Sequence, residues 1–408
     1  MNFLIVNQPL NNRGDESAHK ALVRAMLNSL PDAKINILFI GRNQDSVNQY
    51  QIIDNRVKYV NVEPLKGRVR RVLFRFLMLF PFFVMCHPTS RKIIPLYKKA
   101  DIIMCAPGGI CMGGFQNWEH IWLLLIAKFL KKPTVYYGRS IGPFPITTYL
   151  NRIFKKQSIK LLNYFSFISL RDSRSANLAD LLNVKYEKTV DSAFLESPCA
   201  EIPNDVKELI GQKPYVVFVP NKLIWHYAYK GKVSLDGVLS FYKKILDVIM
   251  SKYPEYNIVM LPQTFNFDNC KKGDVNFFKD FKQYANCQNL IVVDDIYSSD
   301  IQQTIISKSD CLIGARYHSI VFAINQAVPF VALSYEHKIM GLLESLHKTD
   351  FAVDISSSFD SDENMKKTLS DVSTALNLAY KDEDAQKKAK KIAEECFVKF
   401  QNKVIDLV

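Results

Sequence analysis

The sequence predicts an α/β protein with two domains, and three observations support this prediction. The chain has 408 residues, 48% of them hydrophobic, which is long for one core and sufficient for two domains of about 200 residues each. Predicted strands and helices alternate along most of it. A polar, proline-bearing segment at 196–213 is the expected linker. We therefore predict an N-terminal α/β domain over 1–195, a C-terminal α/β domain over 214–358, and charged helices over 359–408.

The first predicted strand, residues 3–6, leads through a short loop into an amphipathic helix. The loop holds Asn12 and Asp15 and lacks the GxGxxG spacing of a dinucleotide-binding turn. Two interpretations stay open. The two side chains shape the floor of a sugar or anion site, or they form a plain capping turn at the start of the helix.

Residues 66–85 combine a basic and an apolar character. The uninterrupted apolar part is only about ten residues long and contains Pro81, so it is too short to span a bilayer. Two interpretations stay open here as well: a helix lying on an anionic membrane surface, or a helix packed under the N-terminal sheet. The basic residues of the segment are Lys66, Arg68, Arg70, Arg71 and Arg75.

A glycine-rich loop, APGGICMGG, follows the predicted core strand at 101–105. Gly108 and Gly109 in this loop would let the backbone approach a ligand closely. The helix predicted after the loop begins at Trp118, whose ring is suited to stacking on a sugar face.

Two arginines follow predicted strands in the same domain. The strand at 134–137 precedes Arg139, and the strand at 165–170 precedes Arg171. Because the carboxyl ends of parallel strands share one edge of a sheet, the two guanidinium groups would line a cleft there. Surface arginines beside solvated aspartates would give the same pattern.

The stretch 311–346 carries the strongest local signal for a site. A buried strand at 311–313 is followed by a turn and by an apolar helix that begins near Arg316 and His318. A helix N-terminus exposes free N–H groups and the positive end of the helix dipole, so it suits an anion. Arg316 can add a bidentate contact to a carboxylate or phosphate, and His318 can exchange a proton near neutral pH.

A second short strand, at 330–333, leads to another helix start that includes Lys338. Polar groups are thus expected beyond the carboxyl ends of two neighbouring parallel strands, the usual place for a site in an open α/β sheet. The alternative for Arg316 and His318 is that they are helix-cap residues of an ordinary α/β domain.

The charge of the chain narrows the class of partner. A formal net charge of +13 favours acidic small molecules, anionic membrane surfaces or nucleic acid. Nucleic acid is the weakest of these, because the sequence has no zinc-ligand spacing, no aromatic RNP-like segment and no long Lys/Arg block.

The eight cysteines are scattered without a CxxC pair, which indicates reduced thiols, and the N-terminus lacks signal-peptide features. We therefore expect a cytoplasmic protein, with a contact at the inner face of the membrane as the open alternative.

Seven motifs, taken in order, resemble the polysaccharide pyruvyl transferases. They are NRGDE, APGGI, GRSIGPF, SLRDSRSANLADLL, DSAF, PQT and GARYHSIVFAINQAVPFVALSYEHK. The resemblance covers roughly residues 10–345, and the last motif is the most specific. Two positions depart from the family pattern: Arg139 stands where members usually have Gln, and Tyr317 stands where Leu, Met or Phe is typical.

The resemblance implies two facing Rossmann-like domains with a cleft between them, as in GT-B glycosyltransferases. It also implies transfer of a pyruvyl group from phosphoenolpyruvate onto a sugar of a surface polysaccharide, or of its lipid-linked precursor, as a ketal. Phosphoenolpyruvate carries a carboxylate and a phosphate, so its pocket needs cationic side chains. The chemistry needs a general acid/base, and neither a metal nor a further cofactor is expected.

The residues are assigned to these roles as follows. The general acid/base is His318; the donor-binding residues are Arg316, Arg171, Lys338 and Arg139; the acceptor-binding residues are Asn12, Asp15, Gly108, Gly109 and Trp118. Two other functions stay open: a GT-B glycosyltransferase that uses a nucleotide sugar, and a non-catalytic, membrane-associated assembly protein of a polysaccharide pathway.

Overall fold

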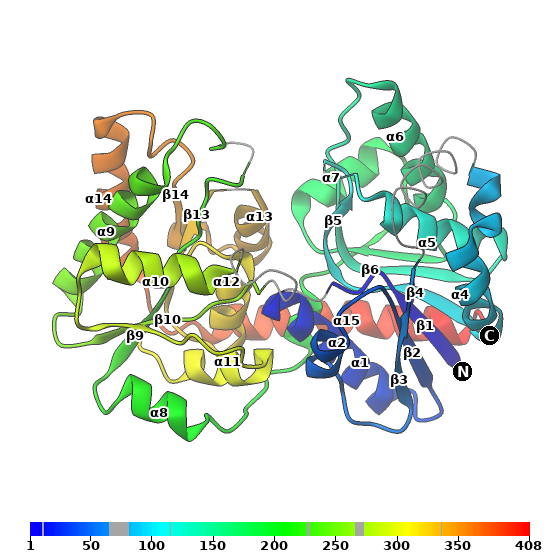
Figure 1. Ribbon diagram of the computed structural model, residues 1–408, viewed down its shortest axis with the longest axis horizontal. Coiled ribbons are helices and arrows are strands. Elements are labelled where there is room, and N and C mark those ends of the chain that lie inside the picture. Colours follow the sequence, from blue (N-terminus) through cyan, green and yellow to red (C-terminus); the bar gives the residue numbers. More distant parts are fainter. Residues whose placement is uncertain (10–11, 65–80, 115, 227–228, 266–272, 336) are drawn as a thin grey trace. The chain divides into compact units, whose positions relative to one another are not determined.

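The computed structural model of the chain describes residues 1–9, 12–64, 81–114, 116–226, 229–265, 273–335 and 337–408 (Figure 1). The predicted membrane or core helix at 66–85 therefore lies outside the described residues except for its last part, where η1 (Pro81–Cys86) is a 3-10 helix. Within the described ranges, no helix is long and apolar enough to cross a membrane. The seven cysteines in these ranges are all free thiols.

The chain divides into two compact units. The first consists of Met1–Leu10, Asp15–Leu195 and Lys391–Val408, and the second of Asn11–Gly14 and Glu196–Lys390. Each unit contains a twisted parallel sheet covered by helices (Figure 1).

The sheet of the first unit has the strand order β3-β2-β1-β4-β6-β7-β8, with β5 paired to β6, and every pairing is parallel. Such a sheet is buried on both faces, which is why its central strands read as unbroken apolar runs, for example IIMC in β4. The strands are β1 (Asn2–Val6), β2 (Lys34–Ile40), β3 (Val57–Val62), β4 (Ile102–Cys105), β5 (Gly108–Met112), β6 (Thr134–Ile141), β7 (Phe167–Leu170) and β8 (Glu187–Lys188).

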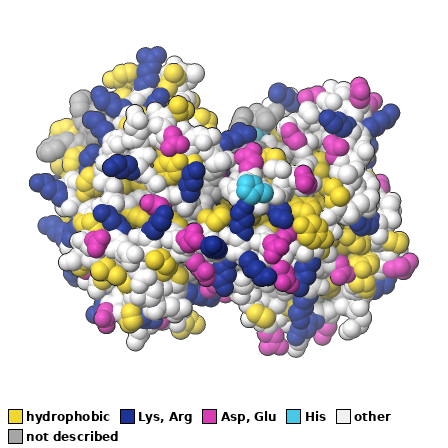
Figure 2. Space-filling model, turned by 180° about the vertical axis from the view of Figure 1, so that it is seen from behind, with side chains coloured by type: hydrophobic (Ala, Val, Ile, Leu, Met, Phe, Trp, Pro, Cys, Tyr) yellow, Lys and Arg dark blue, Asp and Glu magenta, His cyan; other side chains and the backbone are white. Residues whose placement is uncertain are grey.

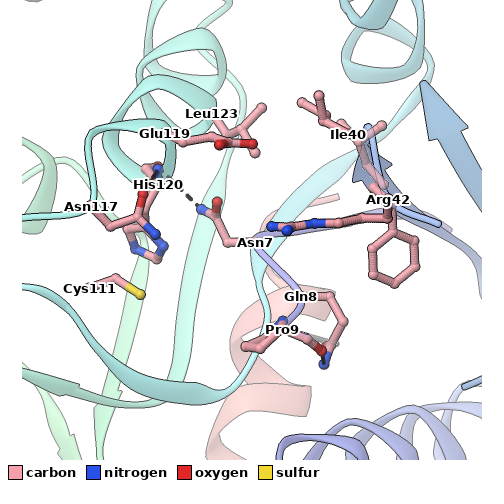
Figure 3. A pocket seen from close by; sticks show the side chains of 12 residues that line it. Asn7, Gln8, Pro9, Ile40, Arg42, Cys111, Asn117, Glu119, His120 and Leu123 are labelled. Atoms are coloured by element: carbon pink, nitrogen blue, oxygen red, sulfur yellow. Dashed lines mark hydrogen bonds between the residues drawn. The ribbon is translucent and has the colours of Figure 1, made fainter. Parts of the chain in front are cut away.

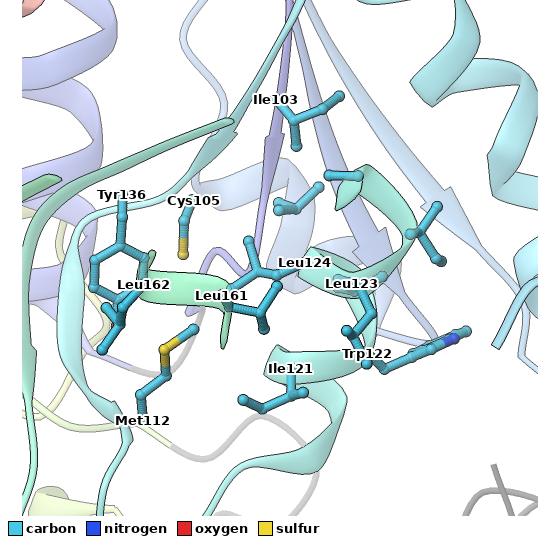
Figure 4. Packing of buried hydrophobic residues seen from close by; sticks show 14 of the residues in the cluster. Ile103, Cys105, Met112, Ile121, Trp122, Leu123, Leu124, Tyr136, Leu161 and Leu162 are labelled. Carbon is cyan, nitrogen blue, oxygen red and sulfur yellow. The ribbon is translucent and has the colours of Figure 1, made fainter. Parts of the chain in front are cut away.

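Alternate residues of each central strand face different helix layers, as the pleat requires. Ile103 and Cys105 of β4 belong to a core that includes Trp122 and Leu161 from the helices of one face (Figure 4). Ile102 and Met104 belong to the core on the other face. The helices of this unit are α1 (Arg13–Ser29), α2 (Gln44–Gln49), α4 (Pro88–Lys99), α5 (Trp118–Phe129), α6 (Tyr149–Leu162) and α7 (Ser173–Leu181), with the 3-10 helix η2 (Ser192–Leu195).

The sheet of the second unit has the order β11-β10-β9-β12-β13-β14 and is also parallel throughout. Its strands are β9 (Tyr215–Val219), β10 (Asn257–Met260), β11 (Leu290–Val292), β12 (Leu312–Gly314), β13 (Phe330–Ser334) and β14 (Ala352–Asp354). Its helices are α8 (Asn204–Ile210), α9 (Leu235–Lys252), α10 (Asp274–Ala285), α11 (Ser299–Ser307), α12 (Tyr317–Asn325), α13 (His337–Leu346) and α14 (Asp362–Leu378), with the 3-10 helix η4 (Thr349–Phe351).

Each sheet reverses its winding direction at one pair of strands. In the first sheet this point lies between β1 and β4, and in the second between β9 and β12. Ligands of open α/β sheets bind beyond the carboxyl ends of the strands at such a switch point. The topology thus places the expected ligand site of each unit at one edge of its sheet.

The structure departs from the predicted elements in two places that matter for the site. Gly108–Met112 forms β5 rather than a loop, and β6 continues to Ile141, so Arg139 lies inside a strand instead of beyond it. Gly138 has φ 57°, which a glycine adopts without strain, and the register of β6 against β7 shifts at this point. The irregularity lets the strand continue past the position where the apolar run ends.

The last helix, α15 (Glu383–Ile405), carries the chain from the second unit back to the first. Its apolar stripe, which includes Cys396, Phe397, Phe400 and Val404, is buried in the core that also holds Ile102 and Met104 of β4. The apolar stripe of α15 therefore packs on the sheet of the first unit.

We predict that Phe400→Ala lowers the free energy of unfolding of the first unit by about 3 to 5 kcal/mol, because the ring is fully buried and its removal leaves a cavity. Phe400 packs edge-on against Tyr137 and Phe167 at ring-centre distances of 5.3 and 5.9 Å. Chemical denaturation followed by tyrosine and tryptophan fluorescence measures the loss. Val398→Ala is the control, because Val398 lies on the same helix with 51% of its surface exposed, and it should change stability by less than about 0.5 kcal/mol. Equal effects of the two variants would contradict the packing described here.

Candidate functional site

Arg316 lies at the N-cap of α12, directly beyond the switch-point strand β12, as the sequence predicts. Its guanidinium forms an ion pair with Asp274, the first residue of α10. Burial alone would lower the pKa of Arg316, but the carboxylate of Asp274 outweighs this effect and raises the pKa above its usual value. Arg316 is thus held as a fixed cation.

Asp274 connects Arg316 to the PQT motif. Its second carboxylate oxygen accepts hydrogen bonds from the backbone N–H groups of Gln263, at 3.1 Å, and Thr264, at 2.9 Å. Only 3% of its side chain is exposed, so the carboxylate must be paired in this way to be tolerated. The motif loop and the start of α12 are therefore positioned by one acidic group.

Residues Asn12 to Gly14 of the NRGDE motif belong to this same unit. Asn12 forms an isolated antiparallel bridge with Thr264, and the backbone N–H of Arg13 donates to the carbonyl of Gln263 at 2.9 Å. The guanidinium of Arg13 lies over the ring of Phe265, 5.0 Å from its centre. Asn12, predicted to bind the acceptor, is therefore placed beside the PQT motif, whereas Asp15 belongs to the first unit.

His318 is the second residue of α12, and its ring packs directly against Gly14. A Cβ at position 14 would lie 1.7 Å from Cγ of the His318 imidazole, so any side chain larger than hydrogen would collide with the ring. The imidazole is buried, at 6% exposure, and lies edge-on to Tyr317 at a ring-centre distance of 5.0 Å. Gly14 thus provides the space in which the imidazole sits.

Gln263 belongs to the PQT motif, but the sequence alone assigns it no role. It is 1% exposed, and within the described ranges neither polar atom of its side-chain amide has a hydrogen-bond partner. A buried amide without a partner costs free energy, which a bound ligand or water would recover. Its backbone is joined to Asp274, so this amide belongs to the Arg316 site.

Lys338 is the second residue of α13, which follows β13, and β13 pairs with β12. The side chain is partly exposed. Tyr335 precedes this helix, and its hydroxyl accepts a hydrogen bond of 2.7 Å from the side chain of Asn221, which follows β9. The carboxyl ends of three adjacent strands, β9, β12 and β13, therefore contribute polar side chains to one edge of the sheet.

Arg139 and Arg171 lie at the equivalent edge of the first unit, and both bind protein groups. Arg139 is fully buried, and its guanidinium donates to the carbonyls of Ala106, at 2.5 Å, and Gly109, at 3.1 Å, and to Sγ of Cys111 at 3.0 Å. These contacts hold the glycine-rich segment in place from the buried side. Arg139 therefore does not line the cleft that the sequence predicted, because its guanidinium is buried against the glycine-rich segment.

Arg171 is 3% exposed and forms an ion pair with Asp191 of the DSAF motif. Its Nε–H also donates to the hydroxyl of Ser140 at 3.3 Å. The pair joins the ends of β6 and β7 to the start of η2. Donor binding by Arg139 and Arg171 stays a prediction, and each has a structural role here.

A pocket of about 190 Å³ opens at the carboxyl edge of the first sheet (Figure 3). Its polar lining comes from the end of β1, the end of β2 and the N-terminus of α5: Asn7, Gln8, Arg42, Asn117, Glu119 and His120. None of the predicted acceptor residues lines this pocket. Trp118 instead packs edge-on against Phe154 of α6, with ring centres 4.9 Å apart, and space remains open around Gly109.

The predicted acceptor residues nevertheless lie close to the pocket along the chain. Cys111, which lines it, follows Gly108 and Gly109 in β5, and Asn117 and Glu119 flank Trp118. The side-chain amide of Gln8 donates to the carbonyl of Asp15 at 3.4 Å. Acceptor binding by Asn12, Asp15, Gly108, Gly109 and Trp118 therefore stays a prediction.

Comparison with known proteins adds a family to this geometry. Residues 12–337 match the sequence profile of the family described as polysaccharide pyruvyl transferase. The amylovoran biosynthesis protein AmsJ of Erwinia amylovora is 22% identical over 388 residues, which cover 88% of this chain and 89% of that protein.

Solved structures support the fold. A UDP-N-acetylglucosamine 2-epimerase from Neisseria meningitidis, bound to UDP-GlcNAc, has a TM-score of 0.57 at 11% identity and covers 98% of this chain and 100% of its own. Arabidopsis thaliana UGT89C1, complexed with UDP, has a TM-score of 0.57 at 11% identity and covers 100% of this chain and 99% of its own. At such identities the likeness concerns the fold alone, and it confirms the predicted GT-B-like fold class with two Rossmann-like domains in one chain.

We predict that Gly14→Ala displaces the His318 imidazole and lowers the free energy of unfolding by about 1 to 3 kcal/mol, since a methyl group has no room against the ring. Two-dimensional NMR of the imidazole groups, assigned through His318→Asn, should show a changed His318 signal. Gly114→Ala is the matched control, because a Cβ there meets nothing within 4 Å. An unchanged His318 signal in Gly14→Ala would show that the ring does not depend on this glycine.

Proposed function

Because the chain belongs to the polysaccharide pyruvyl transferase family, we propose that it transfers a pyruvyl group from phosphoenolpyruvate to a sugar of a surface polysaccharide or of its lipid-linked precursor. The product is a cyclic pyruvate ketal, and inorganic phosphate is released. The observation that carries the proposal is the position of Arg316 and His318 at the N-terminus of α12, at the switch point of the second sheet. This position suits an anionic substrate that must also receive a proton.

We propose that the donor binds through Arg316, Lys338 and the positive end of the α12 helix dipole. Asp274 engages one amino group of the Arg316 guanidinium, while Nε of Arg316 is buried without a partner in the described part of the chain. The remaining N–H groups can form a forked contact to a carboxylate or phosphate. Gln263 offers the same ligand its side-chain amide, which has no hydrogen-bond partner among the described residues.

The proposed reaction proceeds in two additions to C2 of phosphoenolpyruvate. His318 protonates the methylene carbon while one sugar hydroxyl forms a bond to C2 and loses its proton. The C2–O bond to phosphate then breaks, and a second hydroxyl of the same acceptor forms the second bond to C2. Two hydroxyl protons are lost and one is gained by the methyl group, so the other leaves with phosphate.

The leaving phosphate gains negative charge as the C2–O bond breaks. Arg316, Lys338 and the N-terminus of α12 are the groups that we propose stabilise this charge, without a metal or a further cofactor. We place the reaction in the cytoplasm, where phosphoenolpyruvate is produced. Contact of residues 66–85 with a membrane remains a separate proposal, because most of that segment lies outside the described residues.

A nucleotide-sugar glycosyltransferase is the competing function for this fold. A thermal-shift screen separates the two, because a ligand at 100 times its Kd adds about 2.7 kcal/mol of stability. We expect phosphoenolpyruvate to raise the melting temperature and UDP-sugars and GDP-sugars to leave it unchanged. Stabilisation by a nucleotide sugar alone would overturn the proposed donor.

We predict that Arg316→Ala weakens phosphoenolpyruvate binding by about 1.5 to 3 kcal/mol, roughly 10-fold to 150-fold, because it removes a charge-assisted contact. Isothermal titration calorimetry measures this affinity. Lys308→Ala is the control, since Lys308 is an exposed cation elsewhere in the second unit. Unchanged affinity in Arg316→Ala would remove Arg316 from the donor site.

We predict a different result for His318→Asn, in which donor affinity stays within a few fold and turnover falls by about 100-fold or more. Turnover is measured as phosphate release, and NMR detects the methyl group of the new ketal. The acceptor is the polysaccharide of the organism from which the protein comes, after mild acid has removed its ketals. His347→Asn is the matched control, because His347 is exposed. Near-normal turnover in His318→Asn would make His318 a helix-start residue and favour a non-catalytic assembly protein.

A further inference from the structure

The pocket of the first unit lies at that unit's own switch point, and its lining residues all come from the first unit. Asn7 and Gln8 follow β1, Arg42 follows β2, and His120 lies in the first turn of α5 (Figure 3). Asn7 adopts φ 64°, an uncommon conformation for a residue with a side chain, and its amide donates to the carbonyl of His120 at 3.2 Å. The left-handed turn therefore connects the end of β1 to the first turn of α5 across the pocket.

Two buried polar atoms of this pocket have no partner within the described ranges: Oε1 of Gln8 and Nδ1 of His120. The two side chains are 4% and 1% exposed. Nε2 of Gln8 donates to the carbonyls of Pro9, at 3.0 Å, and Asp15, so the orientation of the amide is fixed and Oε1 is the free atom. Nε2 of His120 lies 3.8 Å from Sγ of Cys105, which leaves Nδ1 for a ligand.

The pocket favours a neutral ligand. Burial, and then the positive charge of Arg139, lower the pKa of His120 well below its usual value, so the imidazole is neutral and offers a donor or an acceptor without charge. Arg42 and Glu119 place one charge of each sign at the pocket. Ile40 and Leu123 supply an apolar wall. Mixed donors and acceptors beside an apolar wall match the hydroxyls and C–H face of a sugar ring.

We propose that this pocket binds one sugar unit of the acceptor through its hydroxyl groups, with Arg42 and Glu119 as the contacts that select among sugars. Its volume of about 190 Å³ is below the range of sites for drug-sized ligands and fits a single ring. The role of that sugar as acceptor rests on the proposed pyruvyl transfer, whereas binding of the sugar does not.

Saturation-transfer difference NMR tests the pocket with the methyl glycosides of glucose, galactose, mannose and N-acetylglucosamine. At least one glycoside should bind the wild-type chain, and its affinity should fall about 10-fold in Arg42→Ala and in Glu119→Gln, because each loses a charge-assisted hydrogen bond. Arg152→Ala is the matched control, since Arg152 is an exposed arginine of the same unit outside the pocket. Binding of none of the four, or equal binding by wild type and both pocket variants, would overturn the proposal.

The same proteins are tested with phosphoenolpyruvate by thermal shift. The pocket variants should keep the full stabilisation by the donor, which separates the two proposals. If phosphoenolpyruvate does not stabilise the wild-type protein but a glycoside still binds it, the proposed function is wrong and the sugar-binding pocket is supported.

A second surface of the first unit carries an independent inference. Helices α4, α5 and α6 cover one face of the sheet over a common core. Nζ of Lys132 donates to the carbonyls of Lys98 and Ala100, and Nζ of Lys128 to the carbonyl of Lys160, so the ends of the three helices are tied together.

The outer side of this helix layer is basic and partly apolar. No acidic residue occurs between Glu119 and Asp172 or between Glu63 and Asp101. The exposed cations of the layer include Arg91, Lys92, Lys98, Lys99, Lys131, Arg152, Lys156 and Lys160. At the start of α6, Ile146, Tyr149 and Leu150 are 55%, 72% and 48% exposed. Figure 2 shows basic and hydrophobic side chains together along the upper rim of the lobe that contains α6.

We propose that the exposed sides of α4 and α6 lie on an anionic lipid bilayer. Lysines attract acidic headgroups, and exposed apolar side chains beside them gain free energy only where an apolar phase is available. A soluble polyanion would use the lysines alone. The combination therefore favours a lipid surface over an acidic polymer.

Co-sedimentation with phosphatidylglycerol-containing vesicles tests this surface, with pure phosphatidylcholine vesicles as the comparison. We expect binding to the acidic vesicles only, and about 5-fold weaker binding for each lysine reversed in Lys155→Glu/Lys156→Glu. Lys366→Glu/Lys367→Glu is the matched control, because it reverses an adjacent exposed lysine pair on α14. Tyr149→Ser/Leu150→Ser should also weaken binding. If only the charge reversal has an effect, the face binds polyanions and the lipid proposal is wrong.

Discussion

A parallel sheet must bury both of its faces, so helices cross over each face and the loops at the carboxyl ends of the strands are left to meet ligands. Both sheets of this chain obey that constraint. The polar residues of the motifs accordingly lie at the carboxyl edges of the two sheets, one edge in each unit. At the second edge Arg316 follows β12, and at the first edge Asn7 follows β1.

Within the second unit, Asp274 is the group on which the arrangement depends. It is buried, and it accepts from two backbone N–H groups of the PQT motif while it pairs with Arg316. Removing it would leave a guanidinium charge without compensation and a loop without its anchor. Three segments that are distant in sequence, residues 12–14, the PQT motif and the start of α12, are thereby held in fixed positions beside one another.

The first unit also contains a buried cation, Arg139, but this cation binds neutral groups and not a carboxylate. The described hydrogen-bond partners of Arg139 include no carboxylate. Its N–H groups instead donate to carbonyls and to a sulfur atom of the glycine-rich segment. Burial, and then the same positive charge, lower the pKa of His120. Arg139 thus positions the glycine-rich segment and adds to the effect of burial on the neighbouring imidazole.

The sequence by itself determined the alternation of strands and helices, the two-domain α/β class, and the placement of Arg316 and His318 at a helix start, because periodicity and capping act over a few neighbouring residues. The order of the motifs determined the family. Only the tertiary structure decided that Gly14 makes room for His318, that Asp274 pairs with Arg316, that Arg139 points into the core, and that the last helix packs on the N-terminal sheet. Each of these joins residues far apart in the chain, where local propensity carries no information and only the packing of whole elements brings the partners together.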